Sequence, residues 1–107
     1  MADLNYVAEK FHVAVHCLVS DKPLQQRVYN AYMSFHPIKV EDFKNESELQ
    51  EAYKQIMDSL TVVEGAPGEG RVPATIKQMS DSDAAKLIDS ILSFTFLVDA
   101  ERRSQGY

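Results

Sequence analysis

The sequence predicts an all-α fold, an antiparallel four-helix bundle that forms a single domain over residues 1–107. Three observations predict this class. Apolar residues recur every three or four positions over most of the chain, which is the period of a helix with one buried face. Strand-length alternation of apolar and polar residues is absent, as are the Asn-Gly and Asp-Gly pairs of tight hairpins. Glycine and proline fall at a few positions that separate the periodic segments.

The first two helices are predicted at residues 3–19 and 22–35. Asp3 is a suitable N-cap for the first, because its short side chain can accept a hydrogen bond from a free backbone N–H of the first turn. Asp21 can cap the second, and Pro23 is tolerated in a first turn. The expected buried positions are Leu4, Val7, Phe11, Ala14 and Leu18 in the first helix and Leu24, Val28, Ala31 and Phe35 in the second.

A third helix is predicted at residues 46–63 and a fourth at residues 81–102, with a loop rich in glycine and proline between them. Ser80 and Asp83 resemble a capping box at the start of the fourth helix. The expected buried positions of the third helix are Leu49, Ala52, Tyr53, Ile56, Leu60 and Val63, and Ile38, Val40 and Phe43 in the preceding connector can fold back onto the core.

The fourth predicted helix has an unusually wide apolar face. Eight of the twelve residues 87–98 are large and apolar. Seven of these positions, all except Leu97, span an arc of about 200° together with Ala84, whereas a surface helix typically shows about 100° or more. We therefore expect this helix either to pack centrally against the other three or to meet a second chain. Phe96 and Leu97, at the edge of the arc, are the residues expected to contact a partner.

Composition and charge favour a cytoplasmic protein that does not bind nucleic acid directly. The single cysteine excludes an intramolecular disulfide, and the first residues lack the basic and apolar regions of a secretory signal. The longest apolar run is shorter than the roughly 20 residues that cross a membrane. A net charge of −5 would repel a phosphate backbone, because the basic residues are only weakly segregated.

One group of side chains could in principle hold a metal ion. Glu9, His12 and His16 are spaced three and four residues apart, so they lie on one face of the first predicted helix. A di-iron carboxylate bundle would need a second such element and two further inward carboxylates, which the sequence lacks. The three residues also point away from the apolar line of the helix. We therefore expect solvated side chains, no metal and no cofactor, and keep metal binding as an alternative.

Two other features are candidates for chemistry. The loop at residues 65–73 offers flexible glycines and the guanidinium of Arg71 to an anion, although it lacks the Lys-Ser/Thr of a phosphate-binding loop and follows a helix. A surface connector is the alternative, and such a loop can also be presented to a protein partner. Cys17 follows His16 directly, but adjacent residues on a helix point about 100° apart and do not form a dyad, so we expect a partly buried, inert thiol.

Several surface residues are candidates for binding a protein partner. Residues 41–58 contain six acids and two lysines, and Glu46, Glu48 and Glu51 could dock on a basic partner or mimic nucleic acid. A solvated helix face is the alternative. Tyr29 and Met33 are expected on the exposed side of the second helix, and side chains of these types are common interface anchors.

No set of residues in the sequence forms a convincing catalytic constellation. The leading hypothesis is therefore a protein without catalysis that acts through protein–protein interaction, as an adaptor, antitoxin, immunity or inhibitor protein would. A homodimer through the fourth helix, with or without the second, is included. The alternatives are a metal- or anion-binding bundle and an acidic mimic of nucleic acid.

Overall fold

The computed structural model describes residues 3–43 and 45–106. Over these residues the helices are α1 (Leu4–Leu18), α2 (Leu24–Phe35), α3 (Ser47–Leu60), α4 (Arg71–Gln78) and α5 (Asp81–Ser104), with one 3-10 turn, η1 (Val40–Asp42). This part of the chain contains no strand. The predicted all-α class is therefore confirmed.

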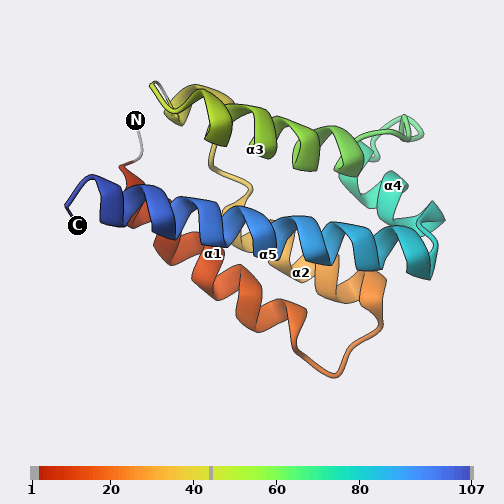
Figure 1. Cartoon of the computed structure of the whole chain (residues 1–107). Helices are drawn as coiled ribbons and strands as arrows, with labels where there is room; N and C mark the ends of the chain where they lie inside the picture. The colour runs from red at the N-terminus through yellow and green to blue at the C-terminus, as the bar shows by residue number, and fades with distance from the viewer. Residues whose placement is uncertain (1–2, 44, 107) are drawn as a thin grey trace.

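α5 runs across the middle of the molecule, with α3 on one side and the α1–α2 hairpin on the other (Figure 1). It contacts α1, α2 and α3. The start of α1 lies beside the end of α5, so these two helices run in opposite directions. Of the two arrangements expected for the last helix, packing against the other three long helices is confirmed by these contacts, whereas contact with a second chain stays a prediction.

The burial of α5 is graded across its wide apolar arc. Ile88 and Leu92 are only partly covered, and Phe96 at the edge of the arc is 70% exposed. The apolar side chains from the opposite edge of the arc to near its centre are buried, namely Phe94, Leu87, Val98, Ile91 and Ala84. The neighbouring helices therefore cover most of the arc and leave one edge open.

The described residues contain five α-helices in place of the predicted four. The additional helix, α4, begins within the segment at residues 65–73 that the sequence predicted as a loop. Gly70 is extended and precedes the first turn of α4, and Pro73 fits because the N–H groups of a first turn need no partner. Val72, Ala74 and Thr75 are buried. Burial against the core stabilises a helix that is too short to be recognised from periodicity.

Three helix ends also differ from the predicted boundaries by two residues or more. α2 begins at Leu24 instead of residue 22, and its N-cap is Pro23 instead of the predicted Asp21, with no side-chain hydrogen bond at the cap. α3 ends at Leu60 instead of residue 63, and α5 continues to Ser104 instead of residue 102. The Thr61 hydroxyl donates a hydrogen bond of 2.8 Å to the Met57 carbonyl, which occupies an acceptor at the end of α3.

In the described part of the chain no helix combines the length and apolar character of a membrane span.

Aromatic rings from four helices and the connector meet in the core. The ring centroids of Phe11 and Phe35 are 4.6 Å apart and those of Phe11 and Phe94 are 4.7 Å apart. Phe43 and Tyr53 complete the cluster with centroids 5.5 Å apart. All five side chains are almost fully buried, so the expectation that Phe43 folds back onto the core is confirmed. Such pairs add to the stabilisation from buried area alone.

Tyr53 introduces one polar group into this cluster. Its hydroxyl donates a hydrogen bond of 2.5 Å to the Ile38 carbonyl, which ties α3 to the connector before η1. Burial, reinforced by nearby Tyr32 and Asp42, raises the pKa of the Tyr53 hydroxyl well above its usual value of 10.0. The folded protein therefore retains this proton at a pH where the unfolded chain loses it.

We predict that Tyr53→Phe lowers the free energy of unfolding at neutral pH by about 1–3 kcal/mol, because the buried Ile38 carbonyl loses its donor. The stabilisation linked to the raised pKa is complete below about pH 10 and is lost as the pH rises further. The wild type should therefore lose up to about 1 kcal/mol per pH unit more than Tyr53→Phe above about pH 10. Denaturant unfolding at several pH values measures this difference, and parallel pH profiles would contradict it.

Candidate protein-binding face

A polar network joins the outer edges of α1 and α5. Asp99 on α5 is at its centre, and its carboxylate oxygens lie 3.0 and 3.1 Å from Nε2 of His12 on α1. A carboxylate only accepts hydrogen bonds when ionised, so Nε2 is the donor. Arg102 lies 3.4 Å from the same carboxylate and donates two hydrogen bonds, of 2.9 and 3.1 Å, to the Asn5 side-chain oxygen. The network fixes the start of α1 against the end of α5.

A hollow of about 290 Å³ lies beside this network, between α1 and α5. Its lining combines apolar side chains with imidazoles and one carboxylate, from His12, Val15, His16, Leu92, Thr95, Phe96 and Asp99. The Thr95 hydroxyl is satisfied, because it donates to the Ile91 carbonyl at 2.9 Å. The hollow is therefore a mainly apolar depression with polar groups at one edge.

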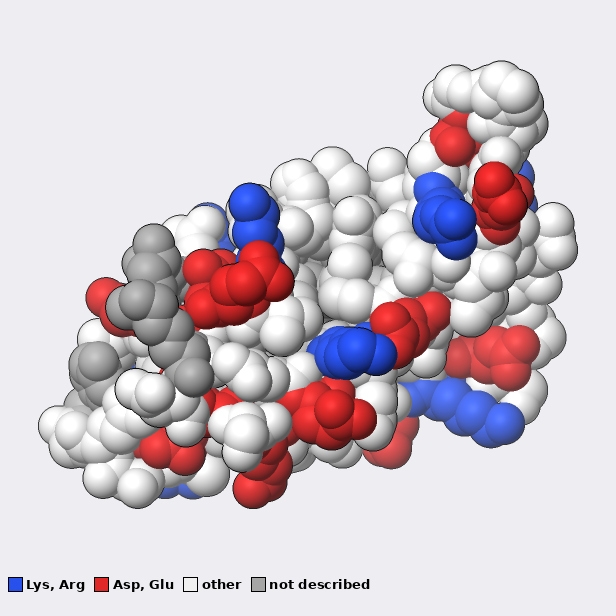
Figure 2. All heavy atoms as spheres, turned by 90° about the horizontal axis from the view of Figure 1, so that it is seen from above, with Lys and Arg blue, Asp and Glu red and all other residues white. Residues whose placement is uncertain are grey.

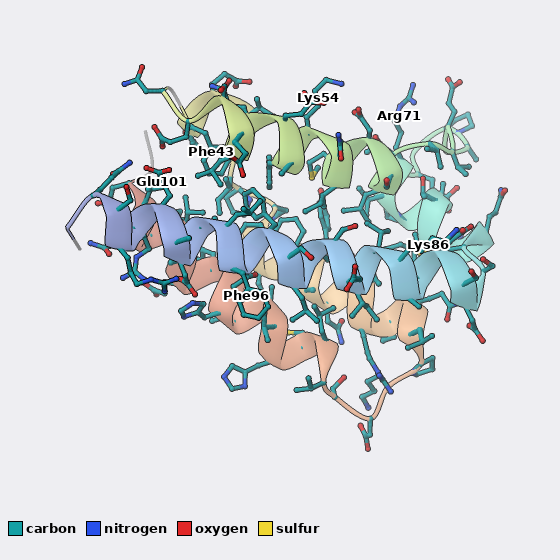
Figure 3. All side chains as sticks on the ribbon, viewed as in Figure 1. Phe43, Lys54, Arg71, Lys86, Phe96 and Glu101 are labelled. Carbon is teal, nitrogen blue, oxygen red and sulfur yellow. The ribbon has the colours of Figure 1, made fainter. Side chains whose placement is uncertain are left out.

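Phe96 stands at the rim of this hollow. Figure 3 shows it in the angle between α5 and α1, on the opposite side of α5 from Phe43. The ring is 70% exposed, whereas Phe43 and Phe94 are 0% and 1% exposed. This face therefore combines a protruding aromatic ring with an apolar hollow that could accept a side chain of a partner. We call Phe96 and the hollow the α1–α5 face.

The structure places the three metal candidates on the outer side of α1. Glu9, His12 and His16 are all exposed, as their position relative to the apolar line indicated. His12 pairs with Asp99. Within residues 3–43 and 45–106, no three His, Cys, Asp or Glu side chains are arranged so that they could hold a metal ion.

Two of the acidic candidates contribute to a second groove, on the other side of α5. Glu46 and Glu48 line a space of about 370 Å³ together with Leu97 and Glu101, which we call the acidic groove. Figure 2 shows carboxylates clustered at the end of the molecule where α3 begins and α5 ends, and Figure 3 places Glu101 on the side of α5 that faces α3. Glu51 lies outside this lining and accepts a hydrogen bond from Gln55. Leu97 thus lines the same groove as two of the three predicted acids, whereas Phe96 lines the hollow on the other side of α5.

Arg71 lies at the first residue of α4 and is exposed. Its guanidinium donates to the Thr61 carbonyl at 3.4 Å, which holds it against the loop. Glu69 links the loop to α4, because its carboxylate accepts a hydrogen bond of 2.6 Å from the Lys77 ammonium and one of 3.3 Å from the Ala66 N–H. The hydrogen bond from Lys77 is the main cause that lowers the pKa of Glu69. These contacts serve the loop itself, and anion binding stays an untested prediction.

The remaining candidates lie along the α1–α2 hairpin. Met33 is 48% exposed, as expected, but Tyr29 is only partly exposed because it packs against the core. Cys17 is partly buried, and its sulfur lies 4.0 Å from the Ser34 hydroxyl. A hydroxyl is no base for a thiol, so this contact is compatible with the expected inert role.

Sequence reasoning missed the partners that organise the α1–α5 face. Asp99 and Asn5 carry no local signal, because their contacts with His12 and Arg102 cross most of the chain. Glu101 belongs to the acidic groove only because α5 returns beside the start of α3. Only the knowledge that the first and last helices lie side by side and antiparallel would have identified these partners from the sequence.

Comparison of the chain with protein-family models, with curated proteins and with solved structures gave no match. A function is therefore inferred from the geometry of the α1–α5 face and of the acidic groove alone.

We predict that Asp99→Ala lowers the free energy of unfolding by about 0.5–1.5 kcal/mol, because the change removes the acceptor shared by His12 and Arg102. Asp58→Ala is the matched control, since Asp58 forms an exposed pair with Lys54 within α3 and should change stability by less than about 0.5 kcal/mol. Urea unfolding of both variants gives the comparison. Equal effects would mean that the network adds nothing beyond a surface ion pair.

Proposed function

We propose that this protein functions by binding proteins through the α1–α5 face and that Phe96 is the central contact residue. The observation that carries the proposal is the 70% exposure of this ring, on the same helix that buries the ring of Phe94. Aromatic residues that protrude beside a pocket are the usual anchors of protein interfaces.

The composition of the face fits binding better than catalysis. An interface needs an apolar centre with a polar rim, and Phe96, Leu92 and Val15 supply the centre. His12, His16 and Asp99 supply the rim. Such a face suits an adaptor or an inhibitory protein, whose function depends on one surface that binds another protein.

We predict that Phe96→Ser abolishes stoichiometric association through this face while leaving the fold intact, because an exposed side chain contributes little to stability. The matched control is Val62→Ser, since Val62 is 71% exposed but lies beyond the end of α3. Affinity capture with the wild type and both variants, quantified by mass spectrometry, measures the effect. A captured protein that is retained equally by Phe96→Ser would contradict the proposal.

A second candidate function is recognition of a basic segment by the acidic groove. The specific observation is that Glu46, Glu48 and Glu101 surround Leu97, which supplies an apolar contact between carboxylates. A short basic helix with one large apolar side chain has the complementary chemistry. This candidate corresponds to an inhibitor that occupies the nucleic-acid-binding site of its partner.

We predict that a synthetic Lys/Arg-rich peptide with a single central leucine binds the wild type and that its affinity falls with rising salt. The double variant Glu46→Lys plus Glu48→Lys should weaken this binding at least about tenfold, whereas Glu51→Lys, outside the groove, should change it less. Fluorescence anisotropy of the labelled peptide measures both. Equal losses in the two variants would show that only net charge matters, and the groove would be rejected.

A further inference from the structure

The outward side of α5 carries a line of three residues at seven-residue spacing, Asp89, Phe96 and Arg103. Residues seven apart on an α-helix lie within about 20° of the same direction, so these side chains share one face. All three are exposed. Over the described residues, neither Asp89 nor Arg103 forms an ion pair with another side chain. The line thus has an acid at one end, an aromatic ring in the middle and a base at the other end.

The positions beside this line allow another helix to approach. Ser93 and Ala100 are small and exposed, and they lie on the side of Phe96 that faces away from α1. The hollow between α1 and α5 lies on the other side. Figure 1 shows α5 at the front of the molecule, with no helix over its outward side.

We propose that the occupant of this face is a second copy of the chain, packed with its α5 antiparallel to the first around a two-fold axis at Phe96. The inference rests on the proposed association through the α1–α5 face and names the partner. In this arrangement Asp89 of each copy faces Arg103 of the other, and the contact occurs twice because a two-fold interface uses the same surface from both copies.

The equal spacing selects the antiparallel orientation. Asp89 and Arg103 are each seven residues from Phe96, or about 10 Å along the helix at 1.5 Å per residue. A parallel pair in register would place Asp89 against Asp89 and Arg103 against Arg103, which repels at both ends. The antiparallel pair places opposite charges together at both ends, and long side chains can join across helix axes about 8–10 Å apart.

The protruding ring and the hollow also complement each other across such an axis. Phe96 stands at the rim of the hollow that Leu92 and Val15 help to line. A two-fold contact lets the Phe96 ring of each copy enter the hollow of the other copy, so that both the exposed ring and the hollow become buried. One outward helix face and its flank form an interface at the small end of the usual range, so we expect micromolar dissociation.

The first test is sedimentation velocity of the full chain at concentrations from about 1 µM to about 1 mM, which spans the expected dissociation constant. The wild type should pass from the 12.1 kDa monomer to a species of twice that mass. Phe96→Ser should raise the dissociation constant about thirtyfold or more. Val62→Ser should leave it unchanged.

The second test exchanges the charges. Asp89→Arg alone and Arg103→Asp alone each place like charges together in a dimer of identical copies, so each should raise the dissociation constant at least about tenfold. An equimolar mixture of the two variants should dimerise again. In the mixed dimer the arginine introduced at position 89 of one copy faces the aspartate introduced at position 103 of the other, and the second contact is the native pair. Glu51→Arg, which changes the net charge as Asp89→Arg does but on α3, is the control. Circular dichroism checks that every variant keeps its helices.

Each outcome decides the proposal. A wild type that stays monomeric throughout, or a dimer that Phe96→Ser leaves intact, overturns the second copy as occupant. A mixture that fails to restore association overturns the antiparallel arrangement. If the chain is monomeric but Phe96→Ser still loses a captured protein, the proposed function stands and only the second copy is wrong. If Phe96→Ser affects neither measurement, both are wrong.

Discussion

The packing of α5 against three other long helices is the constraint on which the rest of the structure depends. Phe94 from this helix enters a cluster with Phe11, and the same cluster receives rings from α2, α3 and the connector before α3. The connector must therefore turn inward, and α3 must lie across α5 from the α1–α2 hairpin (Figure 1). Without this helix, α1 and α2 would still contact each other, but the aromatic cluster would lose Phe94 and α3 would lose the long helix that joins it to the α1–α2 hairpin.

The same constraint explains why one edge of the molecule remains apolar. Three helices cover most of the α5 arc, but α1 diverges from α5 and leaves Phe96 at the open angle between them (Figure 3). The Asp99 network holds α1 in this position at one end. Packing, the polar network and the exposed ring are thus connected features of one helix pair, which is why we locate association on this face.

Much of this arrangement could be predicted from the sequence, because α1, α2, α3 and α5 each carry an apolar line with helical period. α4 could not, since an eight-residue helix with Pro73 gives no clear period and depends on burial of Val72 and Thr75. The angular position of Phe96 predicted its exposure. The seven-residue spacing of Asp89 and Arg103 around it is also visible in the sequence, but its meaning required the knowledge that this side of α5 is uncovered. The pairing of Asn5 with Arg102 depends on the tertiary arrangement alone.

Disulfide cross-linking between copies is the direct test of association through the outward face of α5. In a Cys17→Ser background, Asp89→Cys and Arg103→Cys are prepared as separate single-cysteine proteins and oxidised alone and as a mixture. We expect the mixed 89–103 disulfide to form faster than either homodimeric disulfide, and Phe96→Ser to suppress it. Equal rates for all three pairings, or a mixed disulfide that Phe96→Ser leaves unchanged, would rule out the antiparallel contact at this face.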